Sequence, residues 1–393
     1  MTRIGLRRMV PRDPAQRHRA ASPLELLFDL VFVVAVGLAA TNLHEIEAEG
    51  EITSAVLSYG LVFFSIWWAW MNFTWFATSF DTDDWLYRVM TVVQMAGVLV
   101  LAAGVHAVMV DGDFTVGITG YVIMRLALVG QWIRAAVSST RFRPSAVRYA
   151  VGITAVQVLW VASLALPHDL RPVAAPLLIL AEVLVPVWVE SRSETTPWHT
   201  HHLAERYSLF TLIVLGEGLL ASSNAVIDAL EHTEHLASLL TLAACGLVIT
   251  VGMWWIYFSR EQHDHIRSLP TALVFGYGHY VVFAAAGALP AGLEVAIRAD
   301  GGRVELSSSA VAATVAVPVA LFVLSIWALA IRPSLSRSAN TVVIALTLAV
   351  PASVAVPALS LPVTALLVAA VVVTLEVASP RGMRAPGAPV TVP

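Results

Sequence analysis

Acidic residues interrupt two segments that are otherwise apolar. Glu25 and Asp29 lie within residues 24–43, and Glu217 lies within 203–227. A carboxylate in hydrocarbon costs a few kcal/mol or more, so such residues usually mark an ion path, a proton relay or a substrate site. Carboxylates of this kind could carry protons, bind a small cation or protonate an apolar substrate.

The spacing of the charged residues places them on shared helix faces. Glu25 and Asp29 are four residues apart, so they occupy one face about a turn from each other, and would share a proton if desolvated. Glu205 and Arg206 begin the second segment. Arg206 and Glu217 are eleven residues apart, which returns to nearly the same azimuth and predicts one polar stripe roughly 16 Å long.

Each of these residues could instead have a purely structural role. Glu25 follows Ser22 and Pro23, so it could simply occupy the first turn of a helix, where the helix dipole favours an acid. Glu217 could form an ion pair with an arginine of another helix, and Arg125 is the candidate partner. The predicted intramembrane polar path comprises Glu25, Asp29, Arg125, His202, Glu205, Arg206 and Glu217.

Other polar and aromatic residues are weaker candidates for a functional site. We predict no metal site and no cofactor, because exposed loop histidines are usually only exposed; the weak metal candidates are His199, His201, His263 and His265. His106 and His279 are interpreted as packing residues. Several tryptophans are interpreted mainly as an aromatic belt at a membrane interface, with an aromatic-lined cavity as the alternative: Trp67, Trp68, Trp70, Trp75 and Trp85.

Composition predicts the elements that position these residues. The 393-residue chain is 58% hydrophobic and only 13% charged, against about 25% charged residues in soluble domains. Apolar runs long enough to cross roughly 30 Å of hydrocarbon as helices predict an all-α polytopic membrane protein. About twelve spans are expected, at residues 24–43, 53–77, 87–110, 114–137, 147–166, 172–189, 203–227, 236–258, 271–297, 309–331, 340–357 and 360–378.

The distribution of positive charge predicts the orientation. All 23 basic residues are arginine, and they concentrate in residues 1–23 and in alternate joints, whereas the joints at 44–51, 111–113 and 228–235 contain none. By the positive-inside rule both termini are cytoplasmic, which requires an even number of spans. The predicted location is the bacterial plasma (inner) membrane, with the lipid bilayer as the main partner and no nucleic acid.

A weak internal repeat suggests two parallel six-helix units. Glu25 and Glu205, the pairs at Trp67 and Trp254, and two Ala-Ala-Gly runs recur at offsets of 180 to 187 residues. The predicted organisation is a cytoplasmic Arg-rich segment, a first membrane half, a cytoplasmic joint, a second membrane half and a cytoplasmic tail, at 1–23, 24–189, 190–202, 203–378 and 379–393.

Three motifs carry a family resemblance. The run from Ser22 to Val36, with its two acids, resembles the opening signature of the bacterial low temperature requirement protein A family. The residues around His202 to Arg206 and Leu215 to Glu217 resemble its second signature. A third set comprises Trp67 to Trp70, Asp81, Tyr121 to Arg125 and Arg134. The resemblance covers about residues 20–300, departs at Leu27, where the family favours Phe, and implies an architecture but no agreed substrate or reaction.

The residues favour transport over enzyme chemistry. The first hypothesis is a secondary transporter or ion-conducting protein in which the intramembrane carboxylates bind a proton or small cation. The second is an intramembrane enzyme in which Asp29 or Glu217 protonates a lipid or isoprenoid. The third is a structural protein that supports membranes in the cold. No nucleotide-binding loop is present, and the sequence does not name a substrate.

Overall fold

The structure is a computed structural model that describes residues 5–14, 16, 19–80, 82–167, 170–231, 236–263 and 266–378. Within these ranges the chain forms twelve α-helices and short π and 3₁₀ turns, with no strand. Each predicted span corresponds to one helix: α1 Pro23–Ala48, α2 Ile52–Phe80, α3 Trp85–Ala103, α4 Thr115–Ser138, α5 Arg143–Ser163, α6 Arg171–Arg192, α7 Thr200–Glu231, α8 Leu236–Phe258, α9 Leu269–Asp300, α10 Ser308–Ile326, α11 Arg337–Ala352 and α12 Pro357–Ala378.

The all-α polytopic class is confirmed. Among the described residues, eleven helices are long and apolar enough to cross a membrane. The twelfth helix, α7, has 32 residues, and its residues 209–226 include one charged side chain, that of Glu217. It nevertheless packs along α8 and α9 for much of its length, so the element with the most unusual composition lies inside the bundle.

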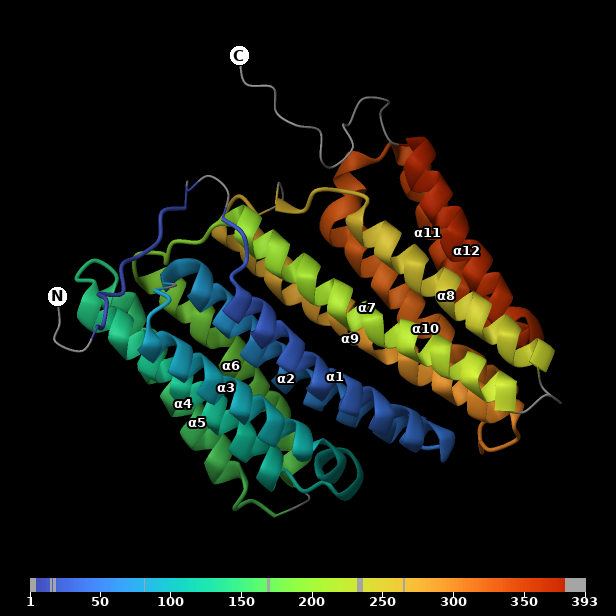
Figure 1. Ribbon diagram of the computed structural model, residues 1–393, viewed down its shortest axis with the longest axis horizontal. Helices are drawn as coiled ribbons and strands as arrows, with labels where there is room; N and C mark the ends of the chain where they lie inside the picture. The colour runs from blue at the N-terminus through green and yellow to red at the C-terminus, as the bar shows by residue number, and fades with distance from the viewer. Residues whose placement is uncertain are drawn as a thin grey trace.

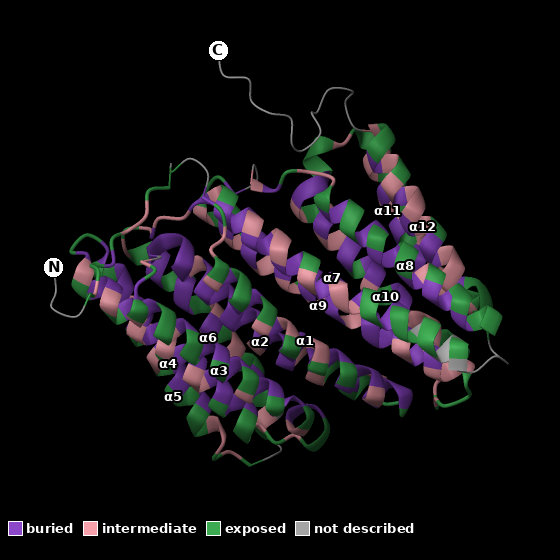
Figure 2. Ribbon diagram, viewed as in Figure 1, coloured by how far each residue is buried: buried purple, intermediate pink, exposed green. Residues whose placement is uncertain are grey.

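Helices α1–α6 gather on one side of the molecule and α7–α12 on the other (Figure 1). Along the middle, α1 and α2 pack against α7 and α9. We call this contact the seam. Buried residues face the inside of the bundle, and exposed residues lie on the outer faces (Figure 2). Many exposed residues are large and aliphatic, such as Val151, Leu177 and Leu366, as expected for surfaces that meet lipid.

The two sides repeat several helix contacts. The first helix packs against the second and third, and the third packs against the fourth, in both α1–α4 and α7–α10. The tryptophan pairs used to detect the repeat have different surroundings, however. Trp67 and Trp68 are buried, whereas Trp254 and Trp255 are 42% and 43% exposed. The duplication and the two-half organisation therefore stay predictions.

The aromatic-belt interpretation is wrong for three of its tryptophans. Trp67, Trp68 and Trp70 are at most 2% exposed. Their rings pack with aromatic residues of α7 and α9, including Phe210 and Tyr280. These side chains occupy the core because α2 lies between the two sides of the bundle. Trp85 is 49% exposed and remains compatible with a belt.

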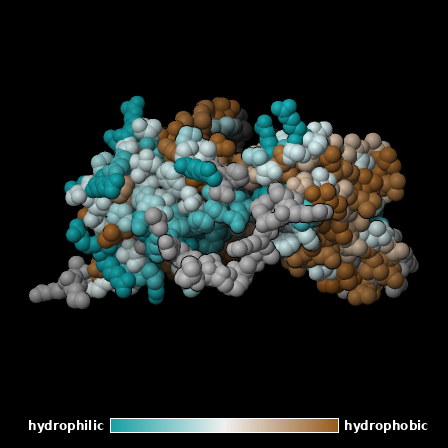
Figure 3. Space-filling view, turned by 90° about the horizontal axis from the view of Figure 1, so that it is seen from above, coloured by the Kyte–Doolittle hydropathy of each residue, from teal (hydrophilic) through white to brown (hydrophobic). Residues whose placement is uncertain are grey.

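The Arg-rich N-terminal segment packs against the helix bundle. Met9 is fully buried. The Arg19 guanidinium is also buried and donates hydrogen bonds to the carbonyls of Ala77 and Thr78, at 2.6 and 2.5 Å. The last carbonyls of a helix have no partner within that helix and attract positive charge. The segment therefore crosses the end of α2 and caps it. Hydrophilic residues gather over the left and centre of this face (Figure 3).

Asp84 joins three parts of the chain at the same end of the molecule. It caps α3 through the backbone N–H of Tyr87, accepts from the backbone N–H of Arg7 at 2.9 Å, and pairs with Arg134 of α4. Burial raises the pKa of this carboxyl, but the bonds from Arg134 and the two backbone N–H groups outweigh burial and hold it below its usual value. The anionic form thus stabilises the fold.

We expect Asp84→Asn to lower the free energy of unfolding by about 1.5–3 kcal/mol at neutral pH, because asparagine can still cap α3 but loses the charged hydrogen bonds with Arg134. Because the folded-state pKa is depressed, this contribution is present above the unfolded pKa of about 4 and is lost as the pH falls through the folded value. Thermal unfolding in detergent at several pH values checks this. Asp83→Asn, which changes the exposed pair with Arg88, is the control. A difference between wild type and Asp84→Asn that persists at low pH would contradict the account.

Candidate functional site

Two acids of α1 converge on one arginine of α7 at the seam. The Arg206 guanidinium is fully buried. Its Nη2 and Nε donate to Asp29 at 2.5 and 3.1 Å, and its Nη1 lies 3.0 Å from Glu25 Oε1. Trp70 of α2 donates from its indole nitrogen to Asp29 at 2.6 Å. A two-point guanidinium–carboxylate contact is among the stronger polar contacts in proteins.

His202 completes this group, one turn before Arg206 on α7. Its Nε2 lies 3.1 Å from Glu25 Oε1. We call Glu25, Asp29, Trp70, His202 and Arg206 the arginine cluster. The two acids were expected to share a proton. They instead share Arg206, which leaves a formal charge of −1 when His202 is neutral.

Glu25 has the structural role foreseen for it as well. Its Oε2 accepts from the Ser22 backbone N–H at 2.8 Å, and the Ser22 hydroxyl accepts from the Glu25 N–H, which completes a capping box at the start of α1. Glu205 lies next to the cluster and accepts from the Ala21 backbone N–H at 3.2 Å. The chain entering α1 is thereby bound to the first turns of α7.

Glu217 lies deeper along the same seam. It is half-buried, and a Cβ placed on Gly37 of α1 would stand only 3.2 Å from a Glu217 carboxylate oxygen. Arg206 and Glu217 therefore both face α1, as the stripe predicted. Within the described part of the chain, Glu217 has no hydrogen-bond or ion-pair partner. The proposed pairing with Arg125 is wrong.

Arg125 instead belongs to a second buried group on the first side of the bundle. Its Nη2 donates to Glu182 of α6 at 2.8 Å. The same carboxylate accepts from Trp68, Gln157 and Tyr121, at 2.9, 2.7 and 3.1 Å. We call these five residues the Glu182 cluster. Its acid was missed in the sequence, although it interrupts an apolar run as Glu217 does.

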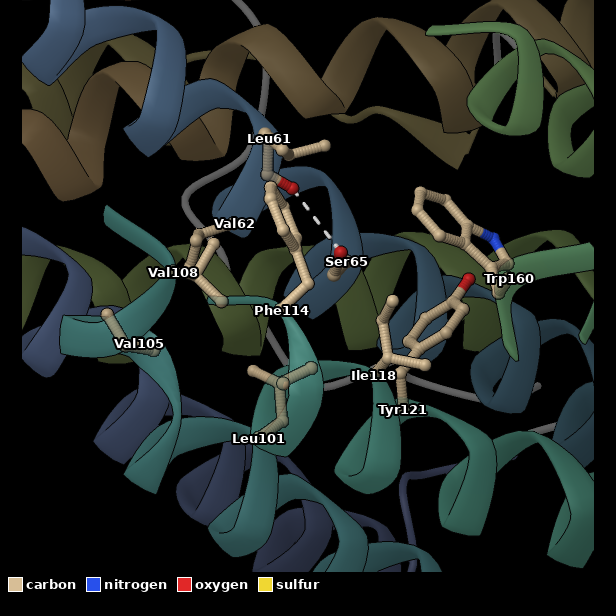
Figure 4. Close-up of a pocket in the computed structure, with 11 residues that line it drawn as sticks. Leu61, Val62, Ser65, Leu101, Val105, Val108, Phe114, Ile118, Tyr121 and Trp160 are labelled. Carbon is tan, nitrogen blue, oxygen red and sulfur yellow. Dashed lines mark hydrogen bonds between the residues drawn. The ribbon is translucent and has the colours of Figure 1, made fainter. Parts of the chain in front are cut away.

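An apolar pocket borders the Glu182 cluster. It is lined by residues of α2, α3, α4 and α5 and of the segment between α3 and α4, and Tyr121 and Trp160 lie side by side at one edge (Figure 4). The Tyr121 hydroxyl bonds to Glu182, while the rest of the lining is mainly aliphatic. The residues of the arginine cluster are not among those that line this pocket, so it is a separate feature.

A further acid, Glu47, lies at the far end of the seam. The structure extends α1 to Ala48, beyond the predicted end at residue 43, and Glu47 is only 5% exposed. No described residue bonds to its Oε2 atom. Asp29 and Glu47 are eighteen residues apart, which is five full turns, so they share one azimuth about 27 Å apart on α1. Nearby, Asn224 of α7 donates to Glu294 of α9 at 3.0 Å.

The histidines do not assemble a metal site among the described residues, in which no group of three potential ligands occurs. His201 and His263 stack with ring centroids 3.8 Å apart. His199 uses one ring nitrogen with the Gln16 carbonyl and the other with the His202 N–H. His265 lies outside the described residues. His279 is buried and bonds to Phe275 and Tyr257, which fits its interpretation as a packing residue.

Nearly the whole chain is similar to a known bacterial family. The profile of the bacterial low temperature requirement A protein (LtrA) family matches residues 20–377, nearly the whole chain. The chain belongs to the LtrA family. The match extends past the expected limit at residue 300 and includes the last three helices. Of the LtrA motif residues quoted above, Asp81 lies outside the described part of the structure.

A relative of this LtrA chain is an uncharacterized protein of Rhizobium meliloti (strain 1021), RA0937. The two are 29% identical over 301 residues, which cover 70% of each chain. That relative is itself described as uncharacterized, so the similarity assigns no activity. Similarity therefore establishes the LtrA family for this chain and no activity.

Proposed function

We propose that this LtrA protein is a secondary transporter or ion-conducting protein, and that protons or small cations move along the seam. The observation that carries the proposal is a series of carboxylates at three depths. Asp29 and Glu25 lie at one end of α1, Glu217 faces its middle, and Glu47 lies at the other end. The series spans about 27 Å, close to the hydrocarbon thickness of a bilayer.

The charge balance of the series supports this function. Arg206 offsets one of the two negative charges at the arginine cluster, and Glu217 has no described cationic partner. An unpaired carboxylate at membrane depth is costly unless it binds a proton or another cation. Acids at three successive depths along the seam would let a proton or small cation pass from one carboxylate to the next.

The enzyme alternative is less well supported by the contacts of Asp29. Both of its oxygens accept bonds from Arg206, and one also accepts from Trp70. These donors stabilise the anion, whereas an acid that initiates lipid chemistry must carry a proton.

If Glu217 had a purely structural role, its substitution would change only the folding or the abundance of the protein.

The test is flux through purified protein in liposomes with imposed pH and potassium gradients. We expect Glu217→Gln to reduce the flux at least tenfold while folding is retained, since the amide cannot carry a proton. Glu376→Gln, at an exposed position on α12, is the matched control. Absence of wild-type flux in every gradient, or equal flux in wild type and Glu217→Gln, would overturn the proposal.

We further propose the bacterial plasma membrane as the location, with both termini in the cytoplasm. The support is the arginine distribution, because the Arg-rich segment packs at the same end of the bundle as the short joint between α6 and α7. Reaction of single cysteines in the joints with an impermeant reagent on intact cells tests the orientation.

A further inference from the structure

An open apolar groove lies on the outer surface between α4 and α5, away from the seam. The two helices pack against each other at one edge of the bundle (Figure 1). The volume of the groove is about 680 Å³. Its lining includes the small, buried side chains of Ala136 and Ala150, and the larger side chains of Val137 and Val151, which are 73% and 57% exposed. We call it the α4–α5 groove.

The groove is about as long as one leaflet of a bilayer is thick. Its lining on α5 runs from Arg143 to Ala155, twelve residues further along the helix, or about 18 Å. Half of the roughly 30 Å hydrocarbon core is about 15 Å. Among the described residues that line the groove, Arg143 alone is charged, and it lies at one end. The shape therefore suits a lipid of one leaflet, with its acyl chain in the groove and its headgroup at Arg143.

Positive charge gathers at the Arg143 end of the groove. Arg143 Nε donates to the Ala136 carbonyl at 3.0 Å, and Arg8 Nη2 donates to the Ser138 carbonyl at 3.3 Å. These bonds satisfy carbonyls in the last turn of α4, but neither guanidinium forms an ion pair with a described residue. The N-terminus of α5 lies at the same place without a side-chain cap, and helix N-termini favour anions. An anion at this end would balance the charge.

We propose that the α4–α5 groove binds an anionic phospholipid whose phosphate pairs with the Arg143 guanidinium. Arginine holds phosphate through two parallel N–H donors, and no described residue bonds to the Nη atoms of Arg143. A zwitterionic lipid offers the same phosphate but adds a cation, which the two arginines repel. In the predicted orientation the bound lipid belongs to the cytoplasmic leaflet, whose anionic lipids attract basic segments. This inference does not depend on transport along the seam, because its direct consequence is binding.

The experiment compares two lipids with the same acyl chains, dioleoylphosphatidylglycerol and dioleoylphosphatidylcholine, on the full-length protein in detergent. Native mass spectrometry measures the bound lipid during each titration. We expect a saturable first site for phosphatidylglycerol, about tenfold tighter than for phosphatidylcholine, since one charged hydrogen bond contributes roughly this much to affinity. Arg143→Gln should remove this preference and leave phosphatidylcholine binding unchanged. Ala155→Trp, which fills the groove from an exposed position, should weaken the binding of both lipids.

Matched variants separate this result from general charge and surface effects. Arg337→Gln removes an exposed arginine at the start of α11, on the same predicted side of the membrane. Val158→Trp adds a tryptophan on α5 at a position that is 62% exposed and does not line the groove. Both variants should keep the wild-type affinities.

Equal affinity for the two lipids in the wild-type protein would show a merely apolar surface and overturn the proposal. So would an unchanged preference for phosphatidylglycerol in Arg143→Gln, or unchanged binding in Ala155→Trp, when the variant has wild-type thermal stability. Inorganic phosphate should not displace the lipid, and displacement by phosphate at millimolar concentration would mean that the groove contributes nothing.

Discussion

Arg206→Met should lower the free energy of unfolding by about 3–5 kcal/mol, the range measured when one partner of a buried ion pair is removed. Methionine fills much of the same volume but leaves Glu25 and Asp29 without their cation. Both acids are at most 2% exposed, so water cannot replace the guanidinium. Denaturant or thermal unfolding in detergent measures the effect.

A compensating variant distinguishes lost charge pairing from lost packing. Adding Glu25→Gln and Asp29→Asn to Arg206→Met removes the uncompensated charges, so the triple variant should be more stable than Arg206→Met alone. Arg88→Met provides the surface control, since its pair with Asp83 is exposed and should contribute less than about 1 kcal/mol. If Arg206→Met and Arg88→Met were equally mild, the arginine cluster would not hold α1 against α7.

Glu182→Leu should have an effect of similar size, about 3–5 kcal/mol. The change removes the acceptor of four donors, from Trp68, Tyr121, Arg125 and Gln157. Arg125 is 1% exposed, and its guanidinium would be left buried without an anion. Unfolding of wild type and variant under the same conditions gives the difference.

A double-mutant cycle tests this second prediction. Arg125→Met combined with Glu182→Leu should be less destabilised than the sum of the single variants, because contacting partners are not additive. Strict additivity would mean that the two side chains do not stabilise each other. Pairing of Arg125 with Glu217, the expectation from sequence, would instead make Glu217→Leu the coupled change.

The sequence predicted the helices and the stripe on α7 because hydropathy and the helical repeat are local properties. It did not predict the pairing of charges. The sequence shows which face of its helix carries Arg206. Whether Arg206 pairs with Glu25, Asp29 or Glu182 depends on how separate helices pack. That arrangement is set by contacts between distant segments, such as Tyr59 with the Ala284 carbonyl across the seam.

The residues whose location could not be predicted from the sequence can also be explained physically. Glu47 lies in a polar run that predicts a connecting segment. In the structure α1 continues to Ala48, because Leu43 and Ile46 are buried near its end. Glu190 lies in α6, which ends at Arg192, so the joint to α7 is shorter than expected. The buried Trp67 to Trp70 run was assigned to an interface because sequence position gives depth along a helix but not burial.

If protons or small cations move along the seam, the side chain at position 217 must be accessible from water. Cys245 is the only cysteine, so a Cys245→Ser background allows a single cysteine to be placed at 217 and tested with a charged, membrane-impermeant thiol reagent in liposomes. Leu219, an exposed residue of the same helix, is the lipid-facing control. We expect rapid reaction at position 217 and little at 219. No reaction at 217 in folded protein, or equal reaction at both positions, would contradict it.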